Sequence, residues 1–139
     1  RTGRYAVVAR AAGSWITTAS PLDLWPAGDT GHVRATLLRA HPLVRDGEFR
    51  APRLGTRVVT ASLEGQRWWN VRTARVAFAA FTDLGRTAGR LSGAAVDDVD
   101  VGVGVRGRIP GMPGSLRTDA ARGLRDGRMA LSFVYDLGL

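Results

Sequence analysis

A period-two alternation of apolar and polar side chains is the feature that most restricts how this chain can fold. In residues 128–139 the odd positions are all large and apolar, whereas the even positions are mostly small or polar. Strands place successive side chains on opposite faces, so this pattern predicts a strand with one apolar face. The same alternation occurs in residues 4–15, 55–67, 72–85, 99–108 and 115–124. The sequence therefore predicts an all-β fold of six antiparallel strands.

The connections between these segments differ in length. Residues 67–70 and 125–127 are predicted as tight turns, and residues 85–98 and 109–114 as longer loops that contain Gly or Pro. The longest connection, residues 16–54, exceeds an ordinary structureless loop, so we expect it to be functional or folded inward. The length of the whole chain, residues 1–139, suits a single domain.

Two architectures fit long alternating strands. A soluble antiparallel sheet with one wet face alternates in this way. Part of a transmembrane β-barrel does so too, with an apolar outer face and a polar lumen. The barrel is favoured by charges, Gly and Ala on the polar faces, and by Trp15, Trp68 and Trp69 near strand ends. Because the smallest membrane barrels have about eight strands, a barrel interpretation makes this chain a fragment whose edge strands pair with missing strands.

Composition narrows the range of functions. The chain has no cysteine and only two histidines, which excludes disulfide scaffolds and makes a metal site improbable. The net charge is +8, and all 20 basic residues are arginine, but they occur singly rather than in a patch. We therefore expect no dedicated nucleic-acid surface. No nucleophile elbow or P-loop is present, so the chain is predicted to be a non-enzyme without a cofactor.

Five short motifs follow one another along the chain. They are "LRAHP" with Arg39 and His41, the single Glu64, "FTDLG" with Phe81, Asp83 and Gly85, "GVGVR" with Gly102, Gly104 and Arg106, and "LRTDAA" at residues 116–121. Their order resembles the C-terminal β-barrel of the BamA-like bacterial surface antigens, in which the first motif usually reads L-R-G-Y-P. Ala40 and His41 stand here in place of the Gly and the aromatic residue.

The resemblance implies a location and a mechanism. Proteins of this family insert or translocate other proteins at the bacterial outer membrane, with the sixth loop folded into the lumen. By this likeness, the arginine of the loop, Arg39, forms a latch with Asp83 and often with Glu64. The alternation agrees, because both carboxylates fall on polar strand faces. Gly102 and Gly104 would leave room for the loop backbone.

The resemblance also implies partners. The apolar-ended last strand, with Phe133, Tyr135 and Leu139, would be the signal that the assembly machinery reads. The expected partners are outer-membrane lipid, unfolded outer-membrane or secreted proteins, and the remaining strands and periplasmic modules of a longer protein. Two alternatives stay open: a soluble basic all-β domain that binds nucleic acid or another polyanion, and the membrane module of a two-partner secretion transporter or surface enzyme.

Overall fold

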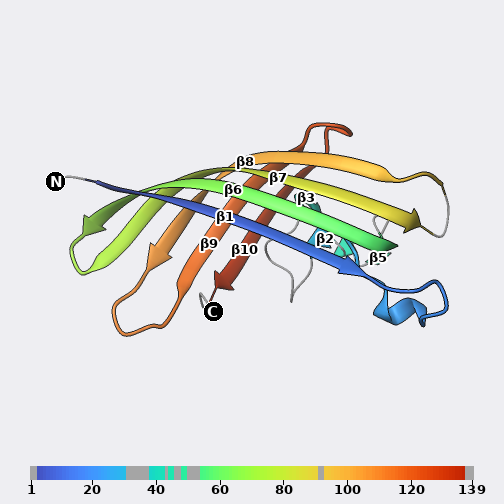
Figure 1. Cartoon of the computed structure of the whole chain (residues 1–139). Coiled ribbons are helices and arrows are strands. Elements are labelled where there is room, and N and C mark those ends of the chain that lie inside the picture. Colours follow the sequence, from blue (N-terminus) through green and yellow to red (C-terminus); the bar gives the residue numbers. More distant parts are fainter. Residues whose placement is uncertain are drawn as a thin grey trace.

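The fold is a single antiparallel sheet of six long strands. A computed structural model describes residues 3–30, 38–42, 44, 45, 48, 49, 54–90 and 93–136. The sheet order is β1-β6-β7-β8-β9-β10 (Figure 1). Its strands are β1 (Arg4–Trp15), β6 (Gly55–Val71), β7 (Ala74–Arg90), β8 (Val96–Arg108), β9 (Ser115–Gly123) and β10 (Met129–Asp136). The predicted all-β antiparallel class is confirmed.

The connection between β1 and β6 carries short elements of its own. They are the 3-10 turn η1 (Leu22–Leu24) and the strands β2 (Asp29–Thr30), β3 (Leu38–Pro42), β4 (Val44–Arg45) and β5 (Glu48–Phe49). β2 pairs with β3 in parallel, and β4 pairs with β5 antiparallel. Within the described ranges, no helix is long and apolar enough to cross a membrane.

One predicted turn is wrong. Trp68 and Trp69 do not form a turn but lie within β6, which pairs with β7 without a gap from Arg57↔Ala88 to Val71↔Ala74. The chain reverses two residues beyond Asn70, at Arg72 and Thr73, and Arg72 has a positive φ of 54°. A two-residue hairpin favours such a φ and is usually marked by Gly or Asn. Arg-Thr carries no such mark, so the sequence did not locate it.

The sheet is covered on its polar face and exposed on its apolar face. The buried side chains of β6 to β9 are largely polar, namely Thr56, Thr60, Ser62, Glu64, Asp83, Thr87, Asp98, Asp100, Arg106, Arg117 and Asp119. The exposed face carries Val7, Val59, Leu63, Phe78, Leu84, Val103, Val105, Leu131 and Phe133. A sheet of a water-soluble protein usually has the opposite arrangement.

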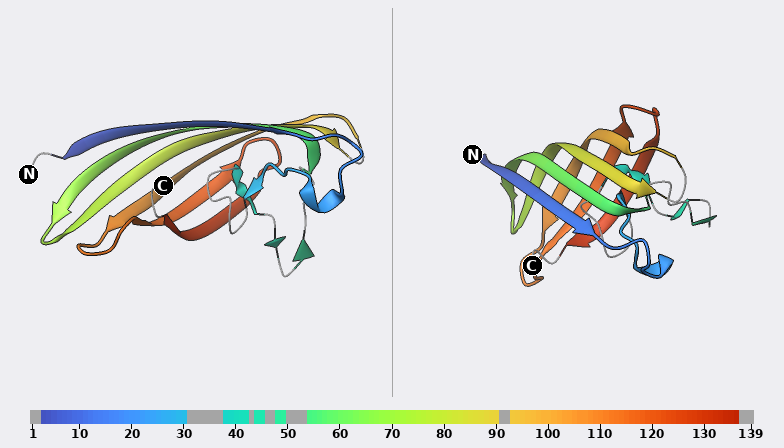
Figure 2. Two further views of the ribbon diagram at one scale, coloured as in Figure 1. Left: turned by 60° about the horizontal axis from the view of Figure 1, so that its bottom comes forward. Right: turned by 45° about the vertical axis from the view of Figure 1, so that its right-hand side comes forward.

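Curvature explains this burial. The sheet is arched, and β3 lies on its concave side against β7, β8, β9 and β10 (Figure 2). The polar side chains point toward this concave side and are covered by β3 and by one another. The sheet is not closed, because β1 and β10 each have one strand neighbour within the described part of the chain.

Candidate functional site

The candidate functional site is the region where β3 packs on the concave face of the sheet. Leu38, Arg39, Ala40 and His41 are each no more than 3% exposed. Leu38 occupies the space above Gly85 in β7, where an added Cβ would lie 2.9 Å from its Cδ1 atom. Ala40 packs in a small cluster with Phe81 and Ala121. A strand of the long connection is thus fully embedded against the sheet.

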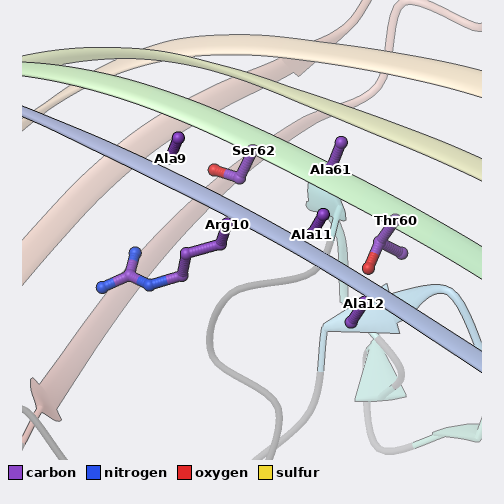
Figure 3. Close-up of a pocket in the computed structure, with 7 residues that line it drawn as sticks. All are labelled: Ala9, Arg10, Ala11, Ala12, Thr60, Ala61 and Ser62. Carbon is purple, nitrogen blue, oxygen red and sulfur yellow. The ribbon is translucent and has the colours of Figure 1, made fainter.

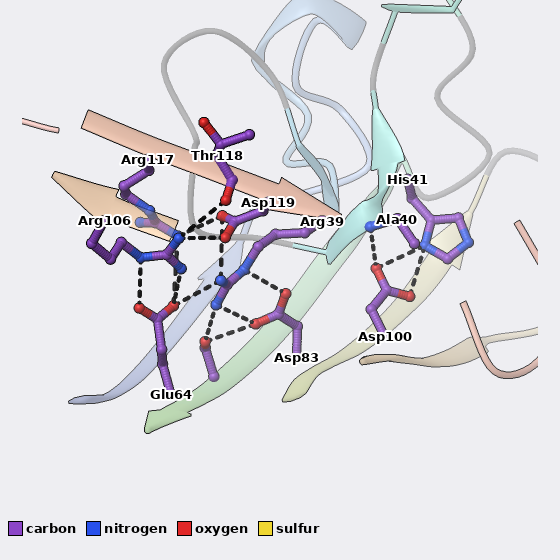
Figure 4. A network of polar contacts seen from close by, with 11 residues as sticks. Arg39, Ala40, His41, Glu64, Asp83, Asp100, Arg106, Arg117, Thr118 and Asp119 are labelled. Atoms are coloured by element: carbon purple, nitrogen blue, oxygen red, sulfur yellow. Dashed lines mark hydrogen bonds and ion pairs between the residues drawn. The ribbon is translucent and has the colours of Figure 1, made fainter. Parts of the chain in front are cut away.

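Arg39 is the centre of the site. Its Nε and Nη2 atoms donate to the two oxygens of Asp83 at 2.9 and 3.0 Å, which is a bidentate pair. Its Nη1 donates to Glu64 at 2.8 Å (Figure 4). Nη2 also donates to the Ser62 hydroxyl at 3.1 Å, and that hydroxyl in turn donates to Asp83. Arg39 therefore contacts both carboxylates that the sequence assigned to it.

An aromatic ring completes the surroundings of Arg39. The guanidinium carbon lies 3.5 Å from the centroid of the Phe81 ring, which is a close cation–π contact. Phe81 fits there because its cross-strand neighbour is Gly102, where a Cβ would collide with the ring. Gly102 thus makes room for the Phe81 ring. We had expected it to make room for the loop backbone.

A second arginine shares the same carboxylates. Arg106 donates from Nε and Nη2 to both oxygens of Glu64 at 2.9 and 2.8 Å, and from Nη1 to Asp119 at 2.6 Å. Its neighbour Arg117 donates to Asp119 at 3.1 Å. Gly104 leaves the space for these side chains, because a Cβ there would collide with Asp119. This too differs from its expected role beside the loop backbone.

The network is electrically balanced. Its positive members are Arg39, Arg106 and Arg117, and its negative members are Glu64, Asp83 and Asp119; all are at most 3% exposed. A balanced, hydrogen-bonded cluster avoids the high free energy of an isolated buried charge. Glu64 forms ion pairs with all three cations, which are Arg39 from the loop and Arg106 and Arg117 from the wall.

A separate set of contacts holds the end of β3. The Ala40 amide donates to Asp100 in β8 at 2.7 Å. The two ring nitrogens of His41 lie 3.1 Å from Asp100 and 3.0 Å from Asp126, which belongs to the β9–β10 turn. The donor and acceptor roles of the two His41 nitrogens depend on which of them carries a proton. His41 thus bridges the sheet wall and a hairpin turn.

The predicted terminal-strand residues lie away from this site. Phe133 and Tyr135 are on the exposed apolar face of β10, 72% and 41% exposed. The Tyr135 hydroxyl donates to the carbonyl of Pro113 in the β8–β9 connection. Leu139, the third predicted residue, lies outside the described residues.

The predicted aromatic girdle is only partly present on the apolar face. Trp15 is 78% exposed at the end of β1. Trp68 instead points to the concave side and is buried, because residues of even number in β6 face that side. The Trp68 indole N–H donates to Gln66, whose amide donates to Glu64. Trp68 is thereby joined to the ionic network.

Several members of the site were not among the predicted site residues. These are Ser62, Asp100, Arg117, Asp119 and Asp126. Alternation placed Asp100 and Ser62 on a polar face, and Arg117 and Asp119 stand in the "LRTDAA" motif. The alternation and the motif thus pointed to these residues, but knowing the face of a residue does not show which side chains it contacts on neighbouring strands.

Two further features of the described residues bear on possible ligand sites. A hollow at the β1–β6 pair is lined mainly by Ala and small polar side chains, with Arg10 at its edge (Figure 3). Within the described ranges, no group of three or more His, Asp or Glu side chains is placed to hold a metal ion. No protein-family model matches the chain, and neither a curated protein nor a solved structure is significantly similar to it.

Proposed function

We propose that this chain forms the C-terminal part of an outer-membrane β-barrel of the BamA-like surface-antigen type, which assists the insertion or translocation of other proteins. The observation that carries the proposal is the inverted sheet. Its convex face is exposed and apolar, and its concave face holds a buried ionic network under an inward-folded strand. An apolar exterior and a polar interior are what a membrane barrel needs.

The two ends of the strands also differ as in such barrels. One end has the two-residue β6–β7 turn and the β8–β9 connection. The other end has the long connection from β1 to β6, together with the β7–β8 and β9–β10 connections. Outer-membrane barrels have short periplasmic turns and longer extracellular loops. The end with the β6–β7 turn would therefore face the periplasm.

The charged side chains of the convex face lie toward its two margins. Arg57, Arg86, Asp97 and Arg122 are exposed and lie near the strand ends on the side of the long connection. Between them and Arg67, near the other end of β6, the outward positions of that strand are Val59, Ala61, Leu63 and Gly65. An uncharged band between charged margins suits a bilayer.

The mechanism has two parts. The contacts of Arg39 with Asp83 and Glu64, the loop latch, hold β3 inside the barrel. The edge strands would form a lateral seam that opens toward substrate strands, and the last strand, residues 128–139, would be one side of that seam. An edge strand offers unpaired backbone groups to an incoming strand. A closed latch would keep the lumen filled while the seam moves.

The test is depletion of the full-length protein in its native bacterium. We expect the protein in the outer-membrane fraction, with a folded form that migrates differently on gels before and after heating. We expect its depletion to lower the amount of other folded outer-membrane proteins. A protein that stays monodisperse without detergent would contradict the proposal and favour a soluble β-domain. Unchanged outer-membrane and secreted proteins would contradict the assembly role and favour the membrane module of a surface enzyme.

A further inference from the structure

A second cluster of arginines lies on the concave face at the end of the sheet with the β6–β7 turn. Arg4, Trp68, Asn70 and Arg75 line a pocket of about 260 Å³. The guanidinium carbons of Arg75 and Arg108 lie 5.3 and 5.1 Å from the Trp68 ring centroid. Two cations therefore share one largely buried indole at the mouth of the concave face.

The register shows that this cluster is electrostatically incomplete. Arg75 of β7 is directly opposite Arg108 of β8, and like charges in this position destabilise a sheet. A comparable pair, Arg106 opposite Arg117, is neutralised by Glu64 and Asp119. Among the described side chains, no carboxylate forms an ion pair with Arg75, Arg108 or Arg4.

We infer that this arginine cluster is a binding site for oxyanions, and that its ligand is the side-chain carboxylates of an acidic polypeptide segment. Guanidinium groups bind carboxylates in bidentate geometry, and an unpaired set on one face leaves these donors available. Arg4, Arg75 and Arg108 lie on β1, β7 and β8. Neighbouring strands are about 4.8 Å apart, so the cluster spans roughly 14 Å, or about four residues of an extended peptide.

The orientation of the cluster favours a polypeptide over a lipid. Its side chains face the concave side. Arg4 and Arg75 are paired with Trp68 and Asn70, and these two residues of β6 face that side. Lipid would contact the opposite, apolar face. There Arg67, beside Tyr5 and Trp69, is the cation at this end of the strands. The oxyanion site is argued from these contacts and does not require the proposed role in protein insertion, whereas the choice of a polypeptide over a lipid rests on the proposed membrane location.

The test measures, by fluorescence anisotropy, how a labelled oligoglutamate peptide binds to the full chain in zwitterionic detergent. An oligoglutamine peptide of the same length is the reference ligand. We expect Arg75→Gln/Arg108→Gln to weaken oligoglutamate binding at least about tenfold, because charge-assisted hydrogen bonds are lost. The matched control, Arg57→Gln/Arg122→Gln, removes the same charge from the apolar face and should change binding less than about threefold.

Other results would overturn the inference. They are equal weakening by both double variants, equal binding of the two peptides, and binding of phosphatidylglycerol vesicles but not of oligoglutamate. Inorganic phosphate is expected to compete, because it uses the same donors. If Arg75→Gln/Arg108→Gln lowers the folded fraction, Arg4→Gln on the exposed edge strand serves instead. It should weaken oligoglutamate binding about threefold, and unchanged binding would then count against the site.

Discussion

Among single residues, Arg39 and Arg86 show how burial changes the energetic value of an ion pair. Arg39 and its partners are almost fully buried, whereas Arg86 and Asp97 are each 66% exposed and 3.5 Å apart. We expect Arg39→Met to lower the free energy of unfolding by about 3–5 kcal/mol, because Asp83 and Glu64 would keep uncompensated buried charges. Arg86→Met should cost less than about 1 kcal/mol. Urea unfolding of both variants in detergent measures the difference.

Arg39→Lys separates charge from geometry in this experiment. It keeps the positive charge but loses the bidentate pair and the stacking on Phe81. Its loss of stability should lie between those of the two methionine variants. Equal stability of all three variants would show that the latch contributes nothing to folding.

Two glycines provide a second comparison at this scale. A Cβ on Gly104 would collide with Asp119 and with the Thr118 carbonyl, whereas a Cβ on Gly65 would meet nothing within 4 Å. We expect Gly104→Ala to destabilise the sheet by about 1–3 kcal/mol through overpacking. Gly65→Ala should be neutral or slightly stabilising. Thermal unfolding of both variants checks this, and equal melting temperatures would argue against the tight packing around Arg106.

The partners of Arg39 illustrate what the sequence can and cannot predict about the site. The alternation assigns Asp83 and Glu64 to polar faces, and the motif order proposes their contact with Arg39. Asp119 and Asp100 lie on the same face, but their contacts depend on the register between β8 and β9 and on the depth of β3. A period of two gives the face of a residue and not its cross-strand neighbour.

At the scale of elements, the strands were predictable and their ends were not. Alternation located β1 at its observed bounds, Arg4–Trp15, because its flanks change pattern there. It ended β6 too early, because Trp68 and Trp69 look like a turn and the real turn has no Gly or Asn. It ended β7 at residue 85 instead of at Arg90, because the glycines of residues 85–98 indicated a loop. Nothing local marked Leu38–Pro42 as a strand, since its burial comes from the sheet beneath it.

The contact of Arg39 with Asp83 predicts what holds β3 on the sheet. Asp83→Arg would place a second cation beside Arg39, so we expect β3 to leave the sheet and residues 16–54 to become accessible to proteases. Asp97→Arg makes the same change at an exposed position and should leave cleavage unchanged. Chymotrypsin is the suitable protease, because the new arginines would add trypsin sites. Equal cleavage of both variants would contradict the latch.

For the whole molecule, the decisive property is which face of the sheet meets the surroundings. Between its charged margins the convex face is largely apolar, and the ionic network occupies the concave side. In water such a surface favours association. In a bilayer it is the stable arrangement, and free edges at β1 and β10 permit further strands to join the sheet. The inverted polarity is thus the property of the whole sheet on which the proposed barrel rests.

A substitution on the convex face distinguishes these surroundings. Val103 lies near the middle of β8 and Val71 at the end of β6, and they are 46% and 49% exposed. In phospholipid vesicles we expect Val103→Arg to cost about 2–4 kcal/mol and Val71→Arg at most about 1 kcal/mol, because the cost of a charge falls toward the membrane surface. A sheet exposed to water would tolerate both changes within about 0.5 kcal/mol. Urea titration of the heat-modifiable folded form measures both free-energy costs. Equal small costs would contradict contact between the convex face and the bilayer.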